Sequence, residues 1–148
     1  MDNIKKITSF SVDHDKIGVG IYVSRIDGDI TTYDLRTRIP NAGDYLDDVT
    51  MHSVEHMLAT YLRNSQISDS VIYFGPMGCR TGFYLLTVNL TFNQVLDELL
   101  RVFKLGANST EIPGNKKIEC GNYLEHDLED AKRECLEYYN VLTEVKRQ

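Results

Sequence analysis

Residues 52–56 (HSVEH) place two histidines and one glutamate within a single short segment. Apolar residues recur every three and four positions along residues 49–64, which predicts an amphipathic helix. Residues four apart on a helix lie one turn above each other, so His52 and His56 could both bind one divalent cation. Glu55 would project near that cation as an acid/base group, as in the inverzincin order of residues.

Two histidines do not complete a metal site, because a catalytic centre commonly uses three protein ligands and leaves one position for water or substrate. The candidates for the third ligand are Cys79, Cys120, His14, His126 or a carboxylate. Cys120 precedes a glycine in a loop ahead of the last predicted helix, where the backbone can turn closely around an ion. The residue types alone leave this choice open, and two unrelated surface histidines are the alternative to a metal site.

Cys79 lies in the glycine-flanked loop 76–82 between two predicted strands, and Arg80 follows it. Nearby positive charge and exposed backbone amides activate a thiol for proton transfer or nucleophilic attack. A small packing residue in a tight turn is the alternative. Cys135 differs, because it lies on the apolar face of the last predicted helix, and we expect it in the core.

Four strands and three helices are predicted to position these residues. The predicted strands are residues 17–25, 30–36, 71–75 and 83–90. Asp27-Gly28 predicts a type I′ hairpin turn between the first two. Besides the helix over 49–64, we expect one helix capped by Thr91 and ending at Gly106, and one starting near Asp127. The hairpin and the short links favour an α+β fold, an antiparallel sheet of about four strands with helices packed against it.

The overall composition fits one domain, residues 1–148, and excludes several classes of function. With 22 acidic and 16 basic residues the net charge is −6, so a nucleic-acid partner is not expected. No apolar stretch approaches the roughly 18 residues of a membrane span, and residues 1–10 lack the apolar core of a signal peptide. Three cysteines are an odd count and too few for a disulfide framework, so we expect a cytoplasmic protein.

Five sequence blocks, in order, resemble the S-ribosylhomocysteine lyase (LuxS) family. They are residues 9–14 (SFSVDH), 33–41 (YDLRTRIPN), 52–56 (HSVEH), 76–84 (PMGCRTGFY) and 120–123 (CGNY). The block around Cys79 is the most specific of them. With the residues between them, the blocks extend the resemblance over nearly the whole chain, from residue 9 to about residue 135.

The resemblance implies a role for each matching residue. The ligands of one divalent metal per chain, natively Fe²⁺ with Zn²⁺ or Co²⁺ as substitutes, would be His52, His56 and Cys120. The acid/base pair would be Glu55 and Cys79. The residues lining the substrate pocket, which lies at a homodimer interface in the family, would be Ser9, His14 and Arg36.

The family converts S-ribosylhomocysteine to homocysteine and 4,5-dihydroxy-2,3-pentanedione, the precursor of the signal autoinducer-2. The resemblance therefore implies a carbonyl that migrates along the ribose carbons, followed by β-elimination of the thioether. Both steps abstract protons next to a carbonyl, which a Lewis-acid metal and two acid/base groups can promote. One thiolate with two imidazoles suits Fe²⁺, Zn²⁺ or Co²⁺ better than Mg²⁺.

Two positions depart from the family pattern. Tyr73 stands where the family has an Asp six residues before the catalytic cysteine, and Thr32 stands where it has a Lys four residues before the pocket arginine. Two other functions also remain open from the residues. One is an inverzincin-type zinc metallopeptidase, which would leave the Cys79 block unexplained. The other is a non-enzymatic interaction domain stabilised by a metal with a fourth protein ligand.

Overall fold

The four predicted strands form one antiparallel sheet in the order β1-β2-β4-β3, in a computed structural model that describes residues 4–148. The strands are β1 (Gly20–Asp27), β2 (Ile30–Arg36), β3 (Val71–Pro76) and β4 (Gly82–Val88). We expect no signal peptide in residues 1–10. Residues 1–3 of that segment lie outside the described residues.

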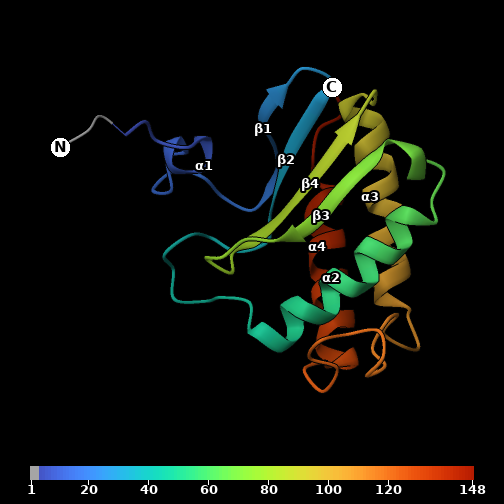
Figure 1. The fold of residues 1–148 in the computed structure, drawn as a ribbon. Coiled ribbons are helices and arrows are strands. Elements are labelled where there is room, and N and C mark those ends of the chain that lie inside the picture. Colours follow the sequence, from blue (N-terminus) through green and yellow to red (C-terminus); the bar gives the residue numbers. More distant parts are fainter. Residues whose placement is uncertain (1–3) are drawn as a thin grey trace.

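Three long helices cover one face of the sheet (Figure 1). They are α2 (Asp48–Arg63), α3 (Phe92–Ala107) and α4 (Leu128–Thr143). Helices α3 and α4 pack along each other, and α2 packs against both of them and against β3. This arrangement confirms the α+β fold class. A short helix α1 (Thr8–Ser11) and a 3-10 turn η1 (Ser68–Ser70) were not predicted, because a single turn is too short to show periodicity.

Alternating side chains of the central strands form the sheet side of the core. Tyr33 and Leu35 of β2 pair in register with Leu85 and Phe83 of β4, and all four are buried. The residues between them point to the other face of the sheet. Cys135 of α4 lies in this core, as predicted, and burial raises the pKa of its thiol to about 12.

The hairpin between β1 and β2 is present, but its predicted turn type is wrong. Asp27 pairs with Ile30, so the two loop residues are Gly28 and Asp29. Of these two, only Gly28 has a positive φ, 59°. A type I′ turn needs positive φ at both positions, whereas a type II′ turn needs it only at the first, where glycine is favoured.

The predicted helix starts are confirmed. Asp47 caps α2 by accepting from the Thr50 N–H at 2.7 Å, and Thr91 caps α3 in a capping box with Gln94. The predicted end of α3 is confirmed to within one residue, but Gly106 is not its stop, because it lies inside the helix, which continues to Ala107 and is capped by Asn108. A Cβ at Gly106 would lie 2.6 Å from the Cys135 sulfur. The glycine therefore allows α3 and α4 to approach closely.

The opposite face of the sheet, called the outer face below, has no long helix over it within residues 4–148. A cavity of about 470 Å³ lies there between the α1 segment and the strands. Its lining includes Ser9, Thr32, Tyr73 and Tyr84. Within the part of the chain that the structure describes, no helix has the length and apolarity of a membrane span.

Candidate metal centre and active site

Four side chains of metal-ligand type meet at the N-terminal half of α2. They are His52 and His56 of α2, Cys120 of the loop 108–127, and His126 just before α4. The Cys120 sulfur lies 3.5 Å from His52 Nε2 and 3.8 Å from His56 Nε2. With metal–nitrogen bonds of about 2.0 Å and metal–sulfur bonds of about 2.3 Å, tetrahedral ligands of these two kinds lie about 3.5 Å apart. The donor set therefore fits a divalent metal in type and in spacing.

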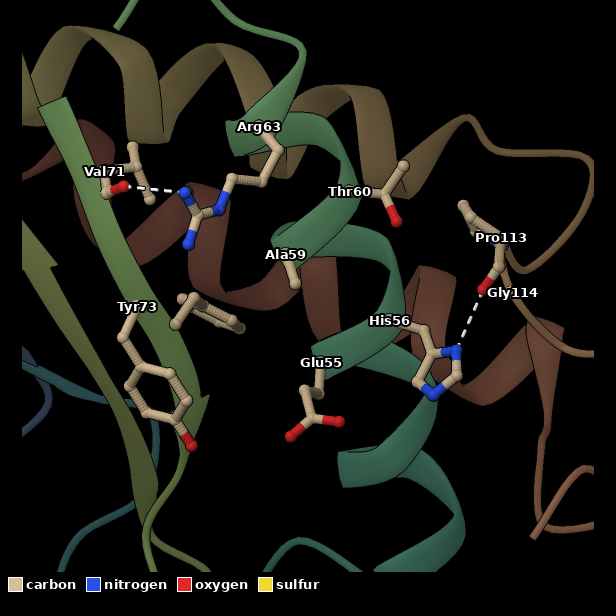
Figure 2. A pocket seen from close by; sticks show the side chains of 10 residues that line it. Glu55, His56, Ala59, Thr60, Arg63, Val71, Tyr73, Pro113 and Gly114 are labelled. Atoms are coloured by element: carbon tan, nitrogen blue, oxygen red, sulfur yellow. Dashed lines mark hydrogen bonds between the residues drawn. The ribbon is translucent and has the colours of Figure 1, made fainter. Parts of the chain in front are cut away.

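The two helix histidines are held by the same kind of contact. His52 Nδ1 lies 3.0 Å from the Glu125 backbone carbonyl and 3.1 Å from its carboxylate. His56 Nδ1 lies 2.9 Å from the Pro113 carbonyl, the contact drawn in Figure 2. A carbonyl oxygen can only accept, so each ring donates from Nδ1 and turns the lone pair of Nε2 toward the cluster.

Cys120 comes from a long segment, residues 108–127, that contains no helix or strand. Segments of this length without regular structure are uncommon in compact domains and often carry function. Its backbone turns around the sulfur, since the Asn122 N–H donates to Cys120 Sγ at 3.4 Å. Of the possible third ligands, the structure brings Cys120 and His126 to the pair on α2.

On the sequence alone, His126 is only one of several candidates for the third ligand, and no distinct role is predicted for it. Burial, followed by the neighbouring rings of His52 and His56, lowers its pKa to about 4. The ring is therefore neutral near pH 7. Its position just before the predicted start of the last helix and six residues after Cys120 is the signal in the sequence that points to it.

Glu55 does not point at the ring of its neighbour His56 but into a cavity of about 430 Å³ between α2 and β3. Figure 2 shows its carboxylate and the Tyr73 ring facing each other across this space. Tyr73 is 51% exposed, and its hydroxyl lies where a Cβ of Gly75 would be. Glycine at position 75 therefore lets the phenol ring lie along β3 beside the Glu55 cavity.

Cys79 is exposed in the tight loop between β3 and β4. Its sulfur lies 3.0 Å from the Thr81 hydroxyl, and the oxygen of that hydroxyl accepts from Arg36 Nη1 at 2.9 Å. Arg80 has a left-handed φ of 61°, and its guanidinium lies over the Tyr45 ring at 5.9 Å. Arg36 is thus the cation that is hydrogen-bonded to the Cys79 loop, and its partner there is the Thr81 hydroxyl.

The three predicted pocket residues come together beside Cys79. Ser9, His14, Arg36 and Cys79 all line one cavity of about 300 Å³. Arg36 is nevertheless buried and already paired, since its guanidinium donates to both Asp34 carboxylate oxygens, at 2.5 and 3.1 Å. His14 is oriented by a contact of 2.8 Å between its Nδ1 and the Val12 carbonyl.

The candidate residues thus form two groups in one chain. The metal half consists of His52, Glu55, His56, Cys120 and His126, and the cysteine half consists of Ser9, His14, Arg36, Cys79 and Thr81. The cavity lined by Glu55 is not lined by Cys79, and the cavity lined by Cys79 includes no member of the metal half. The predicted acid/base pair therefore does not share a cavity.

Comparison with known proteins connects both halves to one family. The family model described as S-Ribosylhomocysteinase (LuxS) matches residues 7–148. An S-ribosylhomocysteine lyase of Borreliella afzelii is 43% identical over 152 residues, covering 98% of this chain and 97% of the relative. The enzymes of the same name from Finegoldia magna and Phocaeicola vulgatus are 42% and 43% identical. They cover 98% and 95% of this chain, and the matches span 96% and 92% of the relatives.

Proposed function

This chain belongs to the S-ribosylhomocysteinase (LuxS) family, and we propose that it is a metal-dependent carbon–sulfur lyase. Its substrate would be S-ribosylhomocysteine, and its products homocysteine and 4,5-dihydroxy-2,3-pentanedione. The observation that carries this proposal is the cluster of His52, His56, Cys120 and His126 in a chain that matches the family along its length. The match does not favour a peptidase or a non-enzymatic metal domain.

The metal ligands in this proposal are His52, His56 and Cys120. The mixed donor set suits Fe²⁺, Zn²⁺ or Co²⁺. The family resemblance is the ground for proposing Fe²⁺ as the native ion. When bound, the ion supplies a Lewis acid for the sugar oxygens on which negative charge develops. The carbonyl contacts at His52 and His56 would keep both rings in the ligating tautomer.

The order of proton transfers follows from the substrate. The sulfur leaves from C5 of the ribose, so elimination requires an acidic proton at C4 and hence a carbonyl at C3. The carbonyl of the open-chain sugar begins at C1, so it must move twice, and each move takes a proton from one carbon and returns one to its neighbour. Glu55 and Cys79, on different sides of the sugar, would move these protons, and groups in such positions contribute about 10²–10⁴-fold each.

The cysteine half would bind the sugar or the amino-acid end of the substrate. Ser9 and His14 line the cavity beside the Cys79 sulfur and support the proposed role in binding. Arg36 also lines this cavity, and its hydrogen bond to Thr81 supports a second role, that of holding the Cys79 loop in place.

We further propose a homodimer in which the cysteine half of one protomer faces the metal half of its partner. The separate cavities of the two halves support this arrangement. So do the exposed apolar side chains near the outer face, with Ile7, Phe10 and Tyr73 each more than half exposed. Residues 1–148 would act as one domain, because the sheet and the three long helices share one core. Three free thiols support a reducing, cytoplasmic location.

A thiol-release assay on anaerobically purified, Fe²⁺- or Co²⁺-loaded protein tests the activity. We expect one free thiol per S-ribosylhomocysteine consumed and about one metal ion per chain. Peptide cleavage without thiol release would contradict the proposal and favour a peptidase. Full activity of a folded, metal-free preparation would contradict the metal requirement.

A further inference from the structure

His126 differs from the other two histidines of the metal half in what its Nδ1 atom contacts. His52 and His56 direct Nδ1 to backbone carbonyls. His126 Nδ1 instead lies 3.1 Å from the hydroxyl oxygen of Ser53. A hydroxyl can donate as well as accept, so this contact sets no tautomer until the other partners of the hydroxyl are known.

The partners of Ser53 settle the direction of this hydrogen bond. Ser53 is fully buried, and its oxygen accepts from the Asp127 N–H at 2.9 Å. Among residues 4–148, the Ser53 proton has no other hydrogen-bond acceptor. A buried hydroxyl proton without an acceptor costs free energy, so the proton points to His126 Nδ1. Nδ1 then accepts, and the ring hydrogen is on Nε2.

The protonated nitrogen of His126 faces the thiolate ligand. Its Nε2 lies 3.8 Å from the Cys120 sulfur, which also receives the Asn122 N–H at 3.4 Å. A nitrogen that carries hydrogen offers no lone pair to a metal, but it can donate to a thiolate. All four candidate ligand atoms lie within 4.8 Å of one another, so proximity alone would have suggested a closed site with four protein ligands.

We propose that His126 is a positioning residue of the metal centre, which donates Nε2–H to the Cys120 thiolate and is not a fourth ligand. One coordination position is then free for the substrate, as a catalytic site requires. The hydrogen bond withdraws charge from the sulfur and holds its orientation, while Ser53 holds the ring. The proposal rests on the metal site of the proposed function but not on the identity of the substrate. A failed thiol-release assay would therefore overturn the proposed activity, whereas the spectroscopic test below can overturn the role of His126 independently.

Co²⁺-loaded protein separates the two roles, because its visible d–d bands report the ligand set and its near-ultraviolet sulfur-to-cobalt band reports the thiolate. In His126→Ala we expect the charge-transfer band to move to longer wavelength, since a thiolate that loses a donor gives up its electron more easily. The d–d bands should stay unchanged. Loss of a supporting contact should also speed release of Co²⁺ to a chelator by about 10-fold or more.

The controls sharpen this test. Ser53→Ala should shift the charge-transfer band less, because the His126 ring is still present and loses only its hydrogen bond to Ser53. His14→Gln, a change outside the metal half, should shift neither band. Altered d–d bands in His126→Ala, or no change in either band, would overturn the proposal. X-ray absorption of Zn²⁺-loaded wild-type protein needs no variant: two imidazoles in the coordination shell support the proposal, and three overturn it.

Discussion

The metal half and the cysteine half of this chain are built in different ways. Two histidines of the metal half, His52 and His56, stand on a long helix that is packed against β3, α3 and α4, and backbone carbonyls fix their rings. Cys79 stands exposed at the tip of a short β3–β4 loop, held through Thr81. The first half is ordered from within the chain, whereas the second presents its reactive group outward. This difference suggests that the metal half can assemble alone and that the cysteine half acts on a neighbour.

The largest effect should come from removing a helix ligand. In His52→Ala one of the three proposed ligands is gone, and we expect metal affinity to fall by about 100-fold or more, and thiol release with it. Elemental analysis after gel filtration measures the metal content. The matched control is His14→Ala, which should keep one ion per chain; equal metal contents in the two variants would contradict the assignment.

Cys79→Ala should impair the cysteine half and leave the metal half intact. We expect full metal content, because no member of the metal half is changed, together with a loss of thiol release of about 10²-fold or more, the range for a positioned acid/base group. Thiol titration during turnover and metal analysis on the same sample check both statements. Release at the wild-type rate would remove Cys79 from the mechanism.

A smaller effect is expected at Thr81, which joins the Cys79 sulfur to Arg36. Thr81→Val removes the shared hydroxyl, so the cysteine loop loses its anchor, and we expect kcat to fall about 10-fold with metal content unchanged. Thr81→Ser keeps the hydroxyl and should retain most of the rate. If both variants behaved alike in steady-state kinetics, the hydroxyl would have no part in positioning Cys79.

A substitution at the α3–α4 contact should affect the metal half and the cysteine half least, because it changes the stability of the core. Gly106→Ala places a methyl group against the buried Cys135 sulfur, which should lower the free energy of unfolding by about 1–3 kcal/mol. Urea denaturation measures the change. Cys135→Ala in the same chain makes room for the methyl group and should restore part of the loss. A neutral Gly106→Ala would show that the helices separate easily.

The sequence predicted best what depends on neighbouring residues. The apolar stripe of α2, the caps at Thr91 and Asp127, and the pairing of His52 with His56 all follow from spacing along one element. Prediction from the sequence failed where a residue's role depends on a segment far away in the chain. The glycine at position 106 is explained by Cys135 on another helix. His126 joins the metal half only because the loop 108–127 folds back on α2. The separation of Glu55 from Cys79 likewise required the three-dimensional structure.

Mixing two inactive variants tests most directly the claim that the two halves meet across a dimer. His52→Ala supplies an intact cysteine half, and Cys79→Ala supplies an intact metal half. After the two are unfolded together, refolded and metal-loaded, each mixed dimer should contain one complete site, so random pairing predicts about a quarter of wild-type thiol release. Activity no higher than that of either variant alone would contradict the account and place both halves of the site within one chain.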